Sequence, residues 1–295
     1  MKISLGQKTR KIYNSIHKQQ SKLDVIEKKL KKVSDSFCSN LPKNFFKGKV
    51  CLDLGCGNMG FFGIEMLKKN AKKVYFVDYD NSINNQLKFK LKKFNPEKYE
   101  IVNKDIEKKI FKNNFFDFIF CIGVIHHLQK NTKILSHIYG YLKNKGVLAF
   151  DVLGEGGVMN KINKILRNEY ENNLNSKWVI NNIFKNKLKQ LQNKIIYKLN
   201  LEEKKIFNMI IKYFDKDLIL TFKDRILSPK YNEFNEIKLI TKLKNIGFKK
   251  IKRIKIINNF NNIRKALSFF YENYKDPYSK FLYGNGNISI IAKKN

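Results

Sequence analysis

The chain is poor in the residues that build disulfide or zinc frameworks. Its 295 residues include only four cysteines, and no two of them form a C-x-x-C pair. A chain of this length with so few cysteines is not a disulfide scaffold, and the pattern favours a reducing, cytoplasmic environment. Cysteine and histidine nowhere show the spacing of a zinc site, so we expect no metal.

Long apolar runs are also missing. The longest nearly apolar stretch, residues 115–125, has eleven residues and contains Asp117, whereas a membrane-spanning helix needs about 20 apolar residues. Residues 1–10 lack the apolar segment that is typical of a secretion signal. We therefore expect a soluble cytoplasmic protein without a membrane partner.

Arginine and acidic residues are scarce relative to lysine. The chain has 60 lysines and arginines against 25 aspartates and glutamates, a net charge of +35, yet only five of the basic residues are arginine. Such a charge favours nucleic acid or an anionic surface as a partner. Proteins that read phosphates and bases tend to use arginine, however, because its planar fork fits these groups. The lysine excess is therefore a weak argument for RNA, although residues 1–50 and 241–295 are the most basic parts.

What the sequence does contain is an alternation of strands and helices. Short apolar runs that end near glycine or aspartate predict strands, and helix-like segments lie between them. This order is typical of an α/β fold with a doubly wound, Rossmann-like, mostly parallel sheet and helices on both faces. The first five predicted strands are 50–52, 74–77, 99–102, 116–122 and 147–152, and the predicted helices between them are 60–70, 81–94 and 131–142.

Other segments predict additions to this sheet. Residues 8–37 have an amphipathic helical pattern, so residues 1–45 are predicted to be an N-terminal helical extension before a main domain of residues 46–295. After the fifth strand, residues 156–230 predict a helical insert that caps the domain. The alternation then resumes with a helix at 235–245, a strand at 248–257, a helix at 262–273 and a strand at 288–292, which makes seven strands.

The segment with the most chemical information is a glycine-rich turn after the first strand. A buried strand runs into Asp53, and the turn that follows opens a helix. Gly55 and Gly57 allow the backbone to approach a ligand at the carboxyl end of the strand. A plain strand-to-helix turn would use glycine as well, but Asp78 ends the second strand, where a carboxylate accepts hydrogen bonds from ribose hydroxyls.

Further motifs follow the third and fourth strands, and together they resemble a known family. Asn103-Lys104-Asp105-Ile106 follows the third strand, and the fourth runs into Gly-Val-Ile-His-His-Leu at residues 123–128. With the glycine turn, these motifs resemble the class I S-adenosylmethionine-dependent methyltransferases, closely over residues 46–155 and loosely over 231–295. The resemblance implies S-adenosylmethionine as the cofactor. It implies these contacts: Asp53, Gly55 and Gly57 around the methionine part, Asp78 at the ribose, Asp105 and Ile106 at the adenine, and Cys121 near the methionine amino end.

An NAD-dependent enzyme is the alternative reading of the same turn. Gly55, Gly57 and Gly60 fit the spacing of a dinucleotide-binding loop. Asp53 directly before the turn, Asp105 and the Gly-Val-Ile-His-His-Leu run favour the methyltransferase.

Two adjacent histidines, His126 and His127, are the candidate catalytic residues. The resemblance places them at the mouth of the active site. Methyl transfer from a sulfonium depends mostly on positioning, and a general base helps only when the acceptor must lose a proton. Because neighbouring side chains point in different directions, we expect one histidine at most to reach the site, while the other packs or faces solvent.

The acceptor is constrained mainly by what is missing. The chain has no Asn/Asp-Pro-Pro-aromatic motif after the fourth strand and no Pro-Cys pair, the motifs of two kinds of base methylation. The insert predicts a lid over a small-molecule pocket, and Glu155 is a candidate for contact with the substrate. We therefore expect a small-molecule methyl acceptor. Methylation of tRNA or rRNA through the basic terminal regions, and a non-catalytic binding protein of the same fold, are the alternatives.

Overall fold

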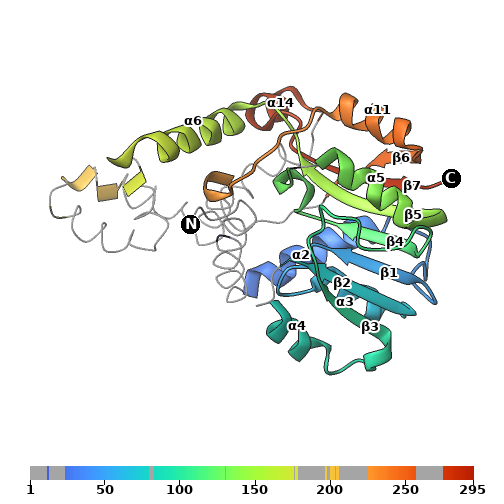
Figure 1. Cartoon of the computed structure of the whole chain (residues 1–295). Helices are drawn as coiled ribbons and strands as arrows, with labels where there is room; N and C mark the ends of the chain where they lie inside the picture. Colours follow the sequence, from blue (N-terminus) through green and yellow to red (C-terminus); the bar gives the residue numbers. More distant parts are fainter. Residues whose placement is uncertain are drawn as a thin grey trace, which may run out of the picture.

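The protein is built around one mostly parallel sheet (Figure 1). The computed structural model describes residues 12, 24–79, 83–129, 131–175, 177–178, 197, 200–202, 204–205, 225–256 and 275–295. The strand order is β3-β2-β1-β4-β5-β7-β6, and only β7 runs antiparallel to its neighbours. The strands are β1 (Val50–Leu54), β2 (Lys73–Asp78), β3 (Tyr99–Asn103), β4 (Phe116–Cys121), β5 (Leu142–Leu153), β6 (Lys249–Arg253) and β7 (Asn287–Lys293).

Helices cover both faces of this sheet. Apolar side chains of α2, α3 and α4 bury one face, and those of α5 and α11 bury the other. The short helices η1 and η2 lie in the connections that precede β3 and follow β4. The helices are α2 (Asp24–Cys38), α3 (Phe61–Lys68), α4 (Ile83–Leu91), η1 (Pro96–Lys98), η2 (Ile125–His127), α5 (Asn131–Tyr141), α6 (Val158–Asn172), α11 (Glu236–Ile246) and α14 (Pro277–Tyr283).

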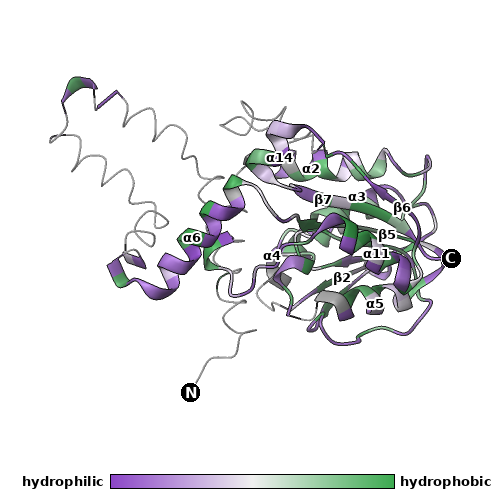
Figure 2. Cartoon of the chain, turned by 90° about the horizontal axis from the view of Figure 1, so that it is seen from above, coloured by the Kyte–Doolittle hydropathy of each residue, from purple (hydrophilic) through white to green (hydrophobic). Residues whose placement is uncertain are grey.

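The central strands are apolar because both of their faces are buried. In β1, Leu52 and Leu54 belong to the core under α5 and α11, whereas Cys51 belongs to the core under α2, α3 and α4. Alternate side chains of a strand point to opposite faces, so a strand covered on both faces needs apolar residues at nearly every position. Figure 2 shows the green strands enclosed by helices whose outer surfaces are largely purple.

The fold predicted from the sequence is confirmed, with corrections to its elements. The predicted sheet of seven strands is present, and β5 begins five residues earlier than expected, at Leu142. Helix α14 was not predicted, because its seven residues are too few for an apolar period. The signal that it does carry is a capping residue, since the Asp276 carboxylate accepts a hydrogen bond from the Ser279 N–H at 3.0 Å.

The additions to the sheet are described only in part. Helix α2 is packed into the core: Phe37 is fully buried, and its ring meets Phe120 edge to face with centroids 5.1 Å apart. Helix α6 is the long described helix of the predicted insert 156–230. The predicted helix at 262–273, most of residues 8–23 and much of the insert lie outside the described residues. The boundary at residue 45 and the role of the insert as a cap stay predictions.

None of the helices within the described ranges is both long enough and apolar enough to cross a membrane.

Candidate functional site

The glycine turn lies at the carboxyl edge of the sheet, and Asp53 of β1 holds the end of the turn at which α3 begins. The side chain of Asp53 is buried, and its Oδ2 accepts a hydrogen bond from the Gly63 N–H, in the first turn of α3, at 2.8 Å. Burial raises the pKa of this carboxyl to about 7, although the hydrogen bond from Gly63 opposes the shift. Asp53 therefore holds the start of α3 against the end of β1.

Gly55 brings this turn into direct contact with the residues that follow β4. Its φ is +78°, a conformation that side chains rarely adopt, and a Cβ added there would collide with Val124 Cγ2. Gly123, in the same connection, has a φ of +74° but open space around it. The turn after β1 and the loop after β4 are thus packed together, and only glycine fits the closest point.

Asp78 joins the end of β2 to the same turn. Its Oδ2 accepts a hydrogen bond from the Gly57 N–H at 3.0 Å, across 21 residues of sequence. A carboxylate has two oxygens that can accept about four hydrogen bonds. Asp78 can therefore hold the turn and also accept hydrogen bonds from hydroxyl groups of a ligand.

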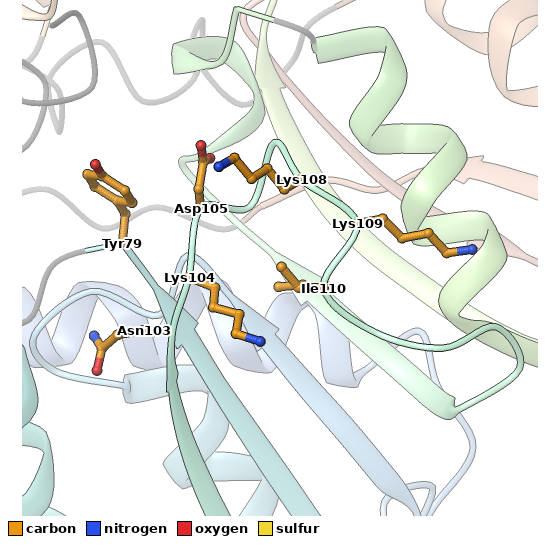
Figure 3. A pocket seen from close by; sticks show the side chains of 7 residues that line it. All are labelled: Tyr79, Asn103, Lys104, Asp105, Lys108, Lys109 and Ile110. Carbon is orange, nitrogen blue, oxygen red and sulfur yellow. The ribbon is translucent and has the colours of Figure 1, made fainter.

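A cavity of about 560 Å³ opens at the ends of β2 and β3, and its lining includes Tyr79, which follows Asp78, but neither Asp78 nor the glycine turn. This volume lies within the range of small-molecule sites. Figure 3 shows the Tyr79 ring and the Asp105 carboxylate directed to the same side of the two strand ends. Tyr79 was missed in the sequence, although an aromatic residue directly after the acidic strand end is a readable signal. The lining residues are Tyr79, Asn103, Lys104, Asp105, Lys108, Lys109 and Ile110.

Asp105 and Ile106 differ in what they present to this cavity. Asp105 lines the cavity, and its Oδ1 accepts a hydrogen bond from the Glu107 N–H at 3.0 Å, which fixes the turn after β3. Ile106 is buried in the core beneath, with 8% of its surface exposed. The apolar side chain that lines the cavity is Ile110 instead.

The loop after β4 is held by a carboxylate that the sequence analysis missed. Cys121 ends β4 fully buried, and burial raises the pKa of its thiol well above the usual range, so it packs as an uncharged group. On the neighbouring strand β5, Asp151 Oδ1 accepts a hydrogen bond from the Gly123 N–H at 2.7 Å. Burial raises the pKa of Asp151 to about 6. An aspartate inside the otherwise apolar run of residues 147–152 was the signal available.

The two histidines of η2 have different environments. His127 Nδ1 lies 3.0 Å from Ser228 Oγ and 3.2 Å from the Lys230 carbonyl oxygen. Because the Ser228 hydroxyl donates to that same carbonyl at 2.7 Å, its oxygen is left to accept, and the proton of His127 is assigned to Nδ1. His127 is thereby fixed by hydrogen bonds to a distant segment.

His126 is buried but less engaged. It is 5% exposed, and its Nδ1 has no hydrogen-bond partner among the residues that the structure describes. Burial and the nearby His127 and Arg225 lower the pKa of His126 well below its usual range, so the ring is neutral. A neutral imidazole can donate or accept a hydrogen bond at this nitrogen, depending on its tautomer.

Residues 228–234, here called the covering segment, lie over the histidines. Side chains of the covering segment point in two directions, toward η2 and toward α6. Ser228 contacts His127, and Asn232 Nδ2 donates to the His126 carbonyl at 3.0 Å. In the other direction, Glu233 forms an ion pair with Lys164 of α6 at 3.0 Å. The covering segment is thus enclosed between η2 and α6.

Glu155, the candidate for contact with the substrate, secures the end of the covering segment. Its side chain accepts a hydrogen bond from Asn235 Nδ2, and its backbone N–H donates to the Phe234 carbonyl at 3.0 Å.

Among the described residues, no three histidine, cysteine, aspartate or glutamate side chains are grouped as metal ligands.

The known proteins to which this chain is similar include methyltransferases. Residues 52–150 match the family model described as a methyltransferase domain. A tRNA U34 carboxymethyltransferase of Helicobacter pylori (strain HPAG1) is 35% identical over 120 residues, which are 39% of this chain and 45% of that protein. The enzyme of the same name from Campylobacter jejuni (strain 81-176) is 33% identical over 114 residues, or 37% of each chain. The matched region is thus less than half the length of these relatives.

Solved structures show the same fold at low sequence identity. An S-adenosylmethionine-dependent methyltransferase from Mesorhizobium loti has a TM-score of 0.52 and 11% identity, and the match covers 88% of this chain and 96% of that one. One from Thermotoga maritima has a TM-score of 0.52 and 14% identity, with 97% and 100% covered. At such identities the similarity concerns the fold alone.

Proposed function

Because residues 52–150 belong to the methyltransferase-domain family and the chain has the class I S-adenosylmethionine-dependent methyltransferase fold, we propose that it transfers a methyl group from S-adenosylmethionine to a small-molecule acceptor. The observation that carries the cofactor assignment is the hydrogen bond between Asp78 and the Gly57 N–H. It joins a ribose-type carboxylate to the glycine turn, beside a cavity of suitable size.

In this proposal Asp78 accepts hydrogen bonds from the ribose hydroxyls, and Tyr79 and Asp105 contact the adenine. Gly55 and Gly57 allow the methionine part to approach the backbone. Asp53 and Cys121 support these residues. Asp53 holds the helix that begins after the turn, and Cys121 packs as an uncharged group at the end of β4. When bound, S-adenosylmethionine supplies the sulfonium from which the acceptor takes the methyl group.

On the acceptor side, we assign the contact with substrate to His126 and a positioning role to His127. His127 already has hydrogen-bond partners, whereas Nδ1 of His126 has none among the described residues and its ring is neutral. The contact between Gly55 and Val124 puts η2 next to the glycine turn. The neutral ring of His126 can therefore orient the acceptor through a hydrogen bond, and if it takes the proton that the acceptor loses, it becomes an imidazolium.

A tRNA acceptor is the second candidate, favoured by a separate observation. The two relatives described above are tRNA U34 carboxymethyltransferases, and this chain carries a net charge of +35. The similarity to them covers only 39% and 37% of this chain, and the basic residues are mostly lysine. For these reasons we place tRNA second.

Calorimetric titration with S-adenosylmethionine, with S-adenosylhomocysteine and with NAD tests the cofactor assignment. We expect micromolar binding of the first two and no heat with NAD. Binding of NAD, or of none of the three, would refute it. With the cofactor bound, methyl transfer from labelled S-adenosylmethionine to a panel of small amines, phenols and carboxylic acids, with tRNA as a parallel arm, then distinguishes the two classes of acceptor.

A further inference from the structure

Helix α4 touches the glycine turn at two adjacent residues. Gln86 Oε1 accepts a hydrogen bond from Asn58 Nδ2 at 3.0 Å, and Asn58 itself is buried. The next residue, Leu87, is fully buried and packs so closely on Gly60 that a Cβ there would collide with its Cδ1. The side of the turn between Asn58 and Gly60 is therefore covered by α4.

This contact complements the one made by Asp78. Asp78 holds Gly57 from the end of β2, while Gln86, on the helix that follows β2, holds Asn58. Two consecutive residues of the turn are thus tied to two consecutive elements of the chain. The residues that contact a ligand are held in position by the residues that pack against them and hydrogen-bond to them. Gln86 is not among the residues that line the cavity.

We propose that Gln86 is a positioning residue for the cofactor: it raises affinity by ordering the glycine turn through Asn58, without touching the ligand. The inference rests on the proposed function, since it presumes that the turn binds S-adenosylmethionine. It adds a determinant of cofactor affinity that lies outside the strand ends and their loops.

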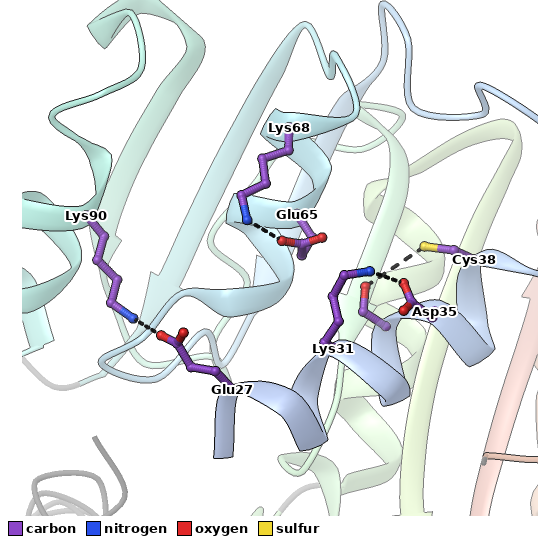
Figure 4. A network of polar contacts seen from close by, with 8 residues as sticks. Glu27, Lys31, Asp35, Cys38, Glu65, Lys68 and Lys90 are labelled. Carbon is purple, nitrogen blue, oxygen red and sulfur yellow. Dashed lines mark hydrogen bonds and ion pairs between the residues drawn. The ribbon is translucent and has the colours of Figure 1, made fainter. Parts of the chain in front are cut away.

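The same helix offers a matched control. Lys90, one turn beyond Gln86, forms an ion pair with Glu27 of α2 at 2.9 Å (Figure 4). Glu27 is 59% exposed and Lys90 34% exposed, and such exposed pairs contribute little. Breaking this pair loosens α4 from α2 but leaves the contact with the turn in place.

The test is the affinity for S-adenosylhomocysteine by calorimetry. We expect Gln86→Met, which keeps length but removes the acceptor, to weaken binding about 3- to 10-fold. The double variant Gln86→Met with Asn58→Ala should bind no more weakly than Asn58→Ala alone, because Asn58→Ala already removes the hydrogen bond to Gln86. Gln86→Glu retains an acceptor oxygen and should bind as the unaltered chain does, as should Lys90→Met.

The outcomes separate the alternatives. Unchanged affinity in Gln86→Met, or an equal loss in Lys90→Met, would overturn the positioning role. A fall in the thermal midpoint of Gln86→Met without a change in affinity would mean a purely structural contact and would overturn it too. Absence of binding by the unaltered chain would instead refute the proposed function, and the inference with it.

Discussion

At the scale of single residues, the site is organised by aspartates that bind the backbone. Three of them lie at or near strand ends on the carboxyl edge, and each accepts an N–H from a glycine. The bonds hold a helix start, the glycine turn and the loop after β4 in fixed positions relative to the sheet. The pairs are Asp53 with Gly63, Asp78 with Gly57, and Asp151 with Gly123.

Asp78 should be the most sensitive of them for cofactor binding. In Asp78→Ala both the ribose hydroxyls and the Gly57 N–H lose an acceptor, so we expect affinity for S-adenosylmethionine to fall by roughly 1.5 to 3 kcal/mol. The measurement is calorimetric titration. Glu100→Ala, which removes an exposed carboxylate on β3, is the control and should leave affinity unchanged. Unchanged affinity in Asp78→Ala would remove the ribose assignment.

Asp53 should make stability depend on pH. Its carboxyl ionises near pH 4 when unfolded and near pH 7 when folded, so the folded state holds an extra proton between these values. The free energy of unfolding therefore falls as pH rises from about 4 to about 8 and is constant above, a loss of about 2.5 kcal/mol between pH 5 and pH 7.5.

Urea unfolding of Asp53→Asn at the two pH values measures this contribution. Between pH 5 and pH 7.5, Asp53→Asn should lose less unfolding free energy than the unaltered chain, and the difference should equal the contribution of the Asp53 carboxyl. The control is Asp35→Asn, whose carboxylate is 50% exposed and which should retain the full dependence. Equal slopes for Asp53→Asn and the unaltered chain would show that the Asp53 carboxyl titrates normally in the folded state.

At the scale of elements, the site depends on how closely the turn after β1 approaches the loop after β4. Gly55 and Val124 are in contact there, and the covering segment packs on η2 through the hydrogen bond from Asn232 to the His126 carbonyl. These elements are far apart in the chain. The distance between the glycine turn and the histidines is therefore set by packing between connections, not by any one helix or strand.

Two glycine substitutions separate close packing from backbone strain. Gly123→Ala meets open space, so it should cost only the strain of a positive φ, about 1–2 kcal/mol. Gly55→Ala has the same strain and also collides with Val124, so we expect a larger loss of unfolding free energy in urea. Adding Val124→Ala to Gly55→Ala should recover part of the loss. Equal losses for both glycines would contradict the close contact.

At the scale of the whole molecule, the excess of lysine sets how the protein meets polyanions. A net charge of +35 produces non-specific attraction to any RNA. If the acceptor is small, binding of tRNA should weaken about 10³-fold or more between about 50 and 200 mM salt, and unrelated RNA of equal length should compete equally. Filter binding at the two salt concentrations measures both. Tight, tRNA-selective binding at the higher concentration would favour the second candidate.

The sequence by itself determined the fold, and it supplied the cofactor residues as a prediction. Continuous apolar strands separated by helices indicated a parallel sheet buried on both faces, because local hydrophobic patterns report which faces are covered. The glycine turn after Asp53 and the strand end at Asp78 predicted that both lie at the same edge of the sheet, since the carboxyl ends of parallel strands meet there, and the structure joins them by a hydrogen bond. These features are local in the chain, so the sequence carries them directly.

Only the tertiary structure decided which side chains hold the turns and loops at that edge of the sheet in place. The hydrogen bonds of Asp151 to Gly123 and of Gln86 to Asn58, and the different environments of His126 and His127, each join segments that are 28 to more than 100 residues apart. Such contacts arise from the packing of helices and loops onto the sheet, and no spacing along the chain encodes them. The two histidines are neighbours in the sequence, and their environments differ because Ser228 and the Lys230 carbonyl lie against the ring of His127.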